Sequence, residues 1–122
     1  MRNIDETEKL FETIIESIRE KQGKDIISLD MTKLQNSITK YFIICHADST
    51  THVSTIAEYI EINAKKKLNE RVWKTEGWEN SQWILLDYSN VVVHVFLNEY
   101  RKYYNLEALW ADSVVFSHSS DN

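Results

Sequence analysis

Two apolar runs, residues 83–88 and 91–96, are separated only by Ser89 and Asn90. This spacing is typical of a β-hairpin with a two-residue turn. If the strands pair in that register, successive side chains alternate between two faces, and one of those faces is wholly apolar. It consists of Ile84, Leu86, Tyr88, Val91, Val93 and Val95. Because such a face must be buried, the hairpin predicts a sheet that is covered by helices.

The opposite face of the hairpin mixes apolar side chains with two titratable ones. It carries Trp83, Leu85, Asp87, Val92, His94 and Phe96. In the predicted register Asp87 lies diagonal to His94, close enough for a contact. We interpret the two as a structural pair that orients the imidazole, and an acid–base site is the second interpretation.

The rest of the chain predicts helices and strands that alternate along the sequence. Helices are predicted at residues 5–22, 49–68 and 99–104, and further strands at residues 25–30, 41–47 and 71–75. Ser49 or Asp48 can cap the second helix, and Asn98 can cap the third. Leu106, Leu109 and Trp110 follow at helical spacing and form a second apolar patch. The pattern indicates an α/β fold with about five strands.

The length of 122 residues fits one domain, which we assign to residues 1–112. Residues 113–122 show no sustained pattern and are expected to form a flexible tail. No apolar run is long enough to span a bilayer, and the acidic N-terminal segment does not look like a secretory signal. The single cysteine, Cys45, lies in an apolar run and agrees with a reducing compartment. A cytoplasmic location without membrane attachment is therefore expected.

Nineteen acidic and fourteen basic residues give a net charge of −5. This charge opposes general binding to nucleic acid and favours a basic partner. The lysines at residues 65–67 are expected to compensate the negative end of a helix dipole. A small RNA-binding patch that includes Arg71 is the alternative.

Several segments together carry a resemblance to a known family. The C-terminal half contains W-I-L-L-D-Y, V-V-V-H-V-F and R-K-Y-Y-N-L-E-A-L-W, and the earlier half contains D-I-I-S-L-D, S-I-T-K-Y-F-I-I and S-T-T-H-V-S-T-I-A. In this order they resemble the ribosomal silencing factor family (RsfS, also called Iojap) over roughly residues 4–112. Two positions depart from the family pattern: Lys40 stands where an acid is usual, and Ser89-Asn90 replaces a Gly-Asp turn.

The resemblance implies a mixed β-sheet with helices packed on it, similar to nucleotidyltransferases but without their catalytic motif. It also implies a protein that binds the large ribosomal subunit through its L-fourteen-type protein. There it blocks association with the small subunit and represses translation when nutrients are limiting. Organelle relatives act in ribosome assembly. A minor contact with ribosomal RNA and a homodimer stay open as further partners.

Aromatic residues and arginine dominate binding hot spots, so they supply most of the candidates for the docking surface. The candidates are Trp78, Trp83, His94, Phe96, Arg101, Tyr104, Leu106, Leu109 and Trp110. For each of them, packing in the core is the alternative role. Trp83 and Arg101 are expected to point outward because of the hairpin register and their polar neighbours.

Two other functions were weighed against docking. A nucleotidyltransferase needs paired carboxylates on one strand face and a Gly-Ser turn for the phosphates. Asp25 and Asp30 are five residues apart and point to opposite faces, and residues 47–49 are not a Gly-Ser turn. No enzyme activity, metal or cofactor is therefore expected. An RNA-binding ribosome-assembly factor, using residues 65–67 and Arg71, is the other alternative.

Overall fold

The computed structural model describes residues 4–34, 39–109 and 114–118. Four helices and six strands occur in these ranges. In chain order they are α1 (Ile4–Glu20), β1 (Lys24–Asp30), β2 (Tyr41–Ala47), α2 (Thr50–Leu68), β3 (Lys74–Glu76), β4 (Trp83–Asp87), β5 (Val91–Leu97), α3 (Asn98–Tyr104), α4 (Leu106–Leu109) and β6 (Val114–His118). The predicted α/β class is confirmed.

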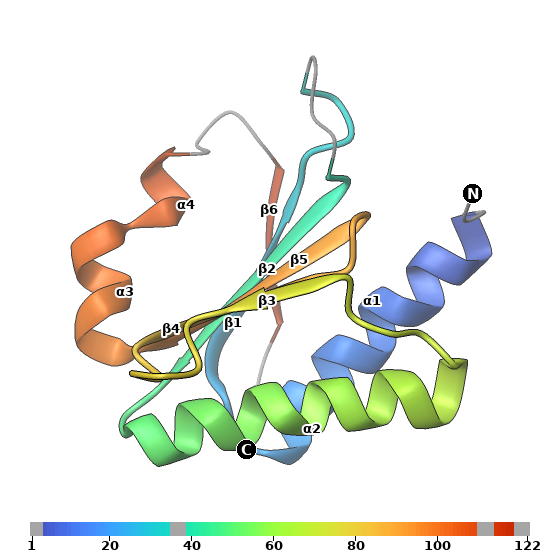
Figure 1. The fold of residues 1–122 in the computed structure, drawn as a ribbon. Helices are drawn as coiled ribbons and strands as arrows, with labels where there is room; N and C mark the ends of the chain where they lie inside the picture. The colour runs from blue at the N-terminus through green and yellow to red at the C-terminus, as the bar shows by residue number, and fades with distance from the viewer. Residues whose placement is uncertain (1–3, 35–38, 110–113, 119–122) are drawn as a thin grey trace.

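The six strands form one mixed sheet in the order β3-β4-β5-β2-β1-β6 (Figure 1). Only β2 and β5 run parallel, and every other neighbouring pair is antiparallel. The parallel pair is connected through α2, β3 and β4. The hairpin of β4 and β5 has the predicted register, with Ile84 opposite Val95 and Leu86 opposite Val93. Its turn places Ser89 at φ 78°, a left-handed conformation that is costly for a residue with a Cβ atom.

The helices α1 and α2 cover the apolar face of the hairpin (Figure 1). All six predicted face residues of β4, the turn and β5 are fully buried beneath them. The apolar stripe of α1 packs there because its residues recur every three or four positions. Ser49 caps α2 as predicted, since its side chain accepts a hydrogen bond from the backbone N–H of His52 at 3.1 Å. The main core therefore agrees with the sequence pattern.

The opposite face of the sheet is also buried, which the sequence did not indicate. A second core consists of Leu29, Met31, Ile44, Phe96 and Leu106, with Tyr100, Trp83 and Phe42 packed against it. Tyr100 and Leu106 belong to α3 and α4, which lie over this face (Figure 1). Of the candidate docking residues on this face, His94 and Phe96 therefore have the alternative role, packing in the core.

The C-terminal segment also differs from its prediction. Residues Val114–His118 form β6, which pairs with β1 from Ile26 to Asp30 and makes a sixth strand. His118 lies 2.8 Å from the hydroxyl of Ser28, and its ring packs edge-on against Phe11. The prediction of a flexible tail is wrong for these five residues, because the backbone of β1 offers hydrogen bonds that do not depend on a side-chain pattern.

Candidate functional site

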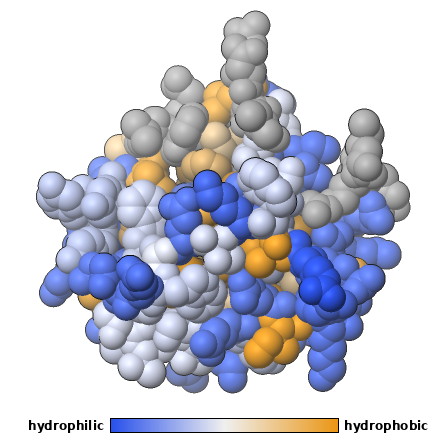
Figure 2. Space-filling model, in the orientation of Figure 1, coloured by the Kyte–Doolittle hydropathy of each residue, from blue (hydrophilic) through white to orange (hydrophobic). Residues whose placement is uncertain are grey.

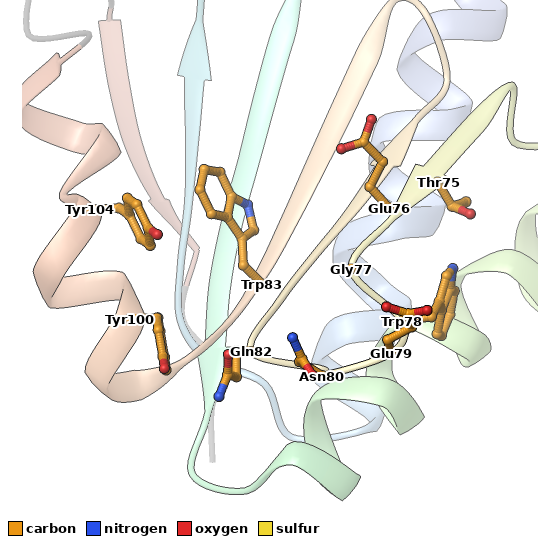
Figure 3. Close-up of a pocket in the computed structure, with 10 residues that line it drawn as sticks. All are labelled: Thr75, Glu76, Gly77, Trp78, Glu79, Asn80, Gln82, Trp83, Tyr100 and Tyr104. Atoms are coloured by element: carbon orange, nitrogen blue, oxygen red, sulfur yellow. The ribbon is translucent and has the colours of Figure 1, made fainter.

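A groove of about 400 Å³ opens between the loop after β3, strand β4 and helix α3. It is lined by Thr75, Glu76, Gly77, Trp78, Glu79, Asn80, Gln82, Trp83, Tyr100 and Tyr104. Figure 3 shows Tyr100 and Tyr104 on α3, on one side of Trp83, and the loop on the other side. We call this feature the aromatic groove.

A chain of aromatic rings in contact with one another lies at the floor of the aromatic groove and continues to the surface. The ring of Trp83 lies 4.9 Å from that of Phe96 and 4.7 Å from that of Tyr104, measured between centroids. Tyr104 in turn lies 5.1 Å from Tyr103 in an edge-to-face arrangement. Phe96 is fully buried, whereas Tyr104 is 46% and Tyr103 80% exposed. The stack thus carries apolar surface from the core out to solvent, where a partner can reach it.

The indole of Trp83 is held by a hydrogen bond within this stack. Its Nε1–H donates to Nδ1 of His94 at 3.0 Å, so the imidazole is neutral with its proton on Nε2. Burial lowers the pKa of His94 to about 4, and its Nε2 has no hydrogen-bond partner among the described residues. The predicted pair with Asp87 is wrong, because Nδ1 of His94 accepts from Trp83 and its Nε2 has no partner among the described residues. The Asp87 carboxylate instead accepts from the backbone N–H of Ser89 at 2.7 Å.

The rim of the aromatic groove is acidic. Glu76 and Glu79 line it, and no lysine or arginine is among its lining residues. Glu76 forms an exposed ion pair with Lys74 at 3.2 Å, which contributes little in water. Together with the net charge of −5, these carboxylates favour a cationic surface opposite the groove.

Gly77 fixes the loop that closes one side of the aromatic groove. It has φ +95°, and a Cβ atom there would overlap the carbonyl oxygen of Trp83. The loop is tightened further by a 3.0 Å hydrogen bond from Ser81 N–H to the Gly77 carbonyl. Glycine at this position therefore allows the loop to approach β4 closely enough to form a wall.

Arg101 is buried, so the prediction that it points outward is wrong. Its guanidinium donates to the carbonyl oxygen of Asp25 at 2.7 Å and to Nδ1 of His46 at 2.9 Å. Burial, and then the charge of Arg101, lower the pKa of His46, which keeps its Nδ1 available as an acceptor. Polar neighbours of Arg101 in the sequence suggested exposure, but the side chain turns inward and attaches α3 to β1 and β2.

The other predicted docking residues are distributed over several environments. Phe96, His94 and Leu106 are buried in the second core and are not accessible to a partner in this structure. Trp78 is half-buried against the main core, and Figure 3 shows its ring on the side of the loop away from Trp83. Trp83 is half-buried, and Tyr104 is exposed as a docking residue requires. The side chain of Leu109 and the whole of Trp110 lie outside the described residues.

Tyr100 and Tyr103 are not among the candidates predicted from the sequence, although both extend the chain of aromatic rings. The signal was available in R-K-Y-Y, since two adjacent tyrosines in a short helix cannot both face the core.

The arrangement offers little for covalent chemistry. Within the described residues, no group of three or more His, Cys, Asp or Glu side chains is placed to hold a metal ion. Burial raises the pKa of the Cys45 thiol to about 12, so it is a poor nucleophile. None of the described helices is both long and apolar enough to cross a membrane.

Comparisons with known proteins agree with the resemblance. The chain matches the family model described as "Ribosomal silencing factor during starvation" over residues 4–122. It belongs to the ribosomal silencing factor (RsfS) family. An RsfS protein of Bacillus subtilis is 42% identical over 94 residues, which cover 77% of this chain and 78% of that relative. An RsfS protein of Chromobacterium violaceum is 37% identical over 86% of this chain and 84% of its own length.

Solved structures give the same fold. A crystal structure of a protein from Chromobacterium violaceum matches with a TM-score of 0.80 at 36% identity, and the match covers 85% of each chain. A second, from Bacillus halodurans, has a TM-score of 0.75 at 32% identity and covers 84% of this chain and 94% of that one. A more distant mouse relative, named for mitochondrial assembly of the ribosomal large subunit, is 28% identical over 80% of this chain and 43% of its own length.

Proposed function

We propose that this RsfS-family protein binds the large ribosomal subunit, docks on its L-fourteen-type protein through the aromatic groove, and represses translation by preventing association with the small subunit. The observation that carries the proposal is the pair of exposed tyrosines, Tyr103 and Tyr104, beside an acidic rim. The names of the bacterial relatives support a silencing role, and the name of the mouse relative supports the large subunit as the partner.

The chemistry of the groove suits a basic protein surface. Aromatic rings bind the apolar stems of lysine and arginine and attract their charges, while Glu76 and Glu79 can pair with those charges at the rim. Because Phe96 and His94 fix Trp83 from below, the floor is ordered before a partner arrives. The protein acts in this proposal by occupying space on the subunit and needs no catalytic group.

Assembly of the large subunit is the second candidate function, and the name of the mouse relative favours it. Both functions use the same docking event, so they differ in when the protein binds. A homodimer through the exposed tyrosines is a further possibility for the free protein. It would compete with docking because both would cover the same rings.

The proposal is tested by sedimentation with separated ribosomal subunits, followed by a subunit-joining assay. The protein should migrate with the large subunit and inhibit joining at saturation. A variant with Tyr103→Ala and Tyr104→Ala should bind about 10- to 100-fold more weakly, since exposed aromatic hot spots contribute on that order. Ile62→Ala, an exposed apolar residue on α2, is the matched control and should bind normally.

Migration with the small subunit alone, or unimpaired joining at saturation, would refute the proposal. Inhibition of joining by the double tyrosine variant at wild-type concentrations would instead place docking on another surface. Circular dichroism of each variant verifies that the fold is retained.

A further inference from the structure

Outside the aromatic groove, Trp73 is a further exposed aromatic residue, and its neighbours in the sequence are basic. Residues 65–76 contain five basic and two acidic side chains, so this segment carries a net charge of +3 in a chain whose total is −5. The lysines at residues 65–67, Arg71 and Lys74 are all exposed. Trp73 lies among them and is 74% exposed. We call residues 65–74 the basic patch.

The backbone of the basic patch is held firmly after the end of α2. Asn69 adopts the left-handed conformation at φ 56°, and its N–H caps the helix by bonding to the carbonyl oxygen of Lys65 at 3.0 Å. Glu70 N–H then bonds to Ala64 at 3.1 Å, and Trp73 N–H bonds to the Asp87 carbonyl at 2.9 Å. These bonds fix the path of the chain from the helix to the sheet.

This path turns the side chain of Trp73 to solvent. Val72 packs against the main core, and adjacent residues of an extended segment point in opposite directions. A single exposed aromatic residue is ordinary on a protein surface. Trp73 differs because its backbone is anchored and its neighbours in sequence are cationic.

A cavity of about 740 Å³ lies beside Trp73. Arg71, Val72 and Trp73 line one part of it, and Thr39, Asp87, Tyr88 and Ser89 line the rest. Its size is in the range of small-molecule sites, and it places a guanidinium and an indole next to the same space. Asp87, the one carboxylate on the lining, accepts a hydrogen bond from Ser89 N–H at 2.7 Å.

The positive charge exceeds what α2 requires. The carbonyl end of a helix carries about half a negative charge, and three consecutive lysines supply six times that amount. Lys65 donates to Asn69 at 2.6 Å and belongs to the helix end, whereas Lys66 and Lys67 extend from it in exposed positions. Figure 1 shows the end of α2 and the segment leading into β3 on the same side of the molecule.

We propose that the basic patch binds an unpaired segment of ribosomal RNA, with a base stacked on Trp73 and flanking phosphates paired with Arg71, Lys66 and Lys67. The RNA source rests on the proposed docking to the ribosome. Single-stranded RNA is recognised by this combination, because every base has a face that stacks on an aromatic ring while cations neutralise the backbone. A duplex keeps its bases stacked on one another and cannot use Trp73 in this way.

Fluorescence anisotropy with a labelled single-stranded RNA of roughly ten nucleotides tests the proposal directly. The protein should bind this RNA more tightly than a duplex of the same sequence. Trp73→Ala should weaken binding by roughly 5- to 150-fold, the range measured for loss of one stacked base, and Trp73→Phe should recover part of the loss. Replacing Lys66 and Lys67 by glutamine should reduce the slope of log affinity against log salt by about 1.4.

Two variants serve as matched controls. Lys33→Gln removes an exposed lysine outside the patch, and Ile62→Ala removes an exposed apolar residue of α2. Both should bind the RNA like the wild type. Absence of binding, equal affinity for the duplex, or an unchanged affinity of Trp73→Ala would overturn the proposal. Binding of polyglutamate with the same dependence on Trp73 would identify an acidic protein as the partner and would also overturn it.

The RNA assay contains no ribosome, so its result is separate from that of the subunit-joining assay. If joining is inhibited but the RNA is not bound, docking stands and the RNA site fails. If the RNA is bound through Trp73 but joining is not inhibited, the RNA site stands and silencing by docking fails.

Discussion

The aromatic groove and the basic patch both expose aromatic side chains, but they differ in charge and in their relation to the core. The groove has carboxylates at its rim and no cation on its lining, whereas the patch has five basic and one acidic side chain, a net charge of +4. The net charge of −5 for the whole chain therefore does not predict the local charge of either region. A surface of mixed local charge can contact ribosomal protein and ribosomal RNA at the same time, whereas the overall charge argues only for a basic partner.

The two regions also differ in what lies beneath the exposed rings. Tyr104 contacts Trp83 in a tilted arrangement, and Trp83 stacks on the fully buried Phe96, so the groove is an extension of the second core. Trp73 is 74% exposed, and its backbone N–H bonds to the Asp87 carbonyl oxygen. Substitutions should therefore affect stability and binding together in the groove, but binding alone in the patch.

The largest difference is expected between Phe96→Ala and Trp73→Ala. Removing a fully buried phenylalanine should lower the free energy of unfolding by about 3–5 kcal/mol, because the cavity cannot be refilled by the stacked rings. Removing the exposed Trp73 should change it by less than about 0.5 kcal/mol. Urea denaturation followed by circular dichroism measures both. Similar losses for the two variants would contradict the distinction between an anchored stack and a surface ring.

Lowering the pH should destabilise the ring cluster beneath the aromatic groove and should leave the basic patch unchanged. Burial lowers the pKa of His94 from 6.5 in the unfolded chain to about 4, so the unfolded state binds more protons between these values. Stability contributed by neutral His94 is complete above pH 6.5 and is lost as the pH falls towards 4, by about 3 kcal/mol. Protonation also converts Nδ1 from an acceptor into a donor, which breaks the bond from Trp83.

Urea denaturation at pH 7 and pH 4.5 measures this loss of stability as a shift of the unfolding midpoint. NMR spectra recorded in parallel follow the indole N–H resonances. The resonance of Trp83 should shift on acidification, and that of Trp73 should not, since residues 65–76 contain no histidine. His94→Asn should reduce the pH slope. Burial also lowers the pKa values of His46 and His118, which will leave part of the slope in place. An unchanged slope in the variant would assign the effect to those two residues.

Charge reversal should have the smallest effect. It should distinguish binding to the ribosomal protein from binding to single-stranded RNA. Glu76→Lys with Glu79→Lys should weaken binding to the isolated ribosomal protein by about tenfold, roughly 1.4 kcal/mol, and should not weaken binding to single-stranded RNA. Lys66→Glu with Lys67→Glu should do the opposite. Surface plasmon resonance at two salt concentrations compares the four combinations. If both pairs weaken both interactions, the two regions form one binding surface.

The sequence was most informative where side-chain alternation decides burial. The two-residue separation of the apolar runs predicted the hairpin register, and that register placed Ile84, Leu86 and Val93 on the buried face. The same pattern did not predict burial on the opposite face of the hairpin. His94 looked like a surface group, but α3 and α4 cover it, and burial by a segment that follows the strand is not encoded in the strand itself.

The pairing of β6 with β1 could not be predicted from the sequence, for a related reason. The strand β6 has only Val114, Val115 and Phe116 as apolar residues before a serine-rich end, too few for a periodic signal. The predicted strand at residues 71–75 includes Trp73, but the exposure of this residue depends on where the strand begins. The structure starts β3 at Lys74, which leaves Trp73 in the connection before it.

The pairing of β6 with β1 has a practical consequence for how the protein is shortened. Trimming the chain after residue 112, where the sequence pattern fades, would remove β6 and leave the backbone of Ile26 to Asp30 as the new border of the sheet. That border belongs to a strand with two fully buried apolar residues, Ile26 and Leu29. Open strand borders of this kind pair with neighbouring molecules, so the trimmed protein should precipitate more readily than the full chain.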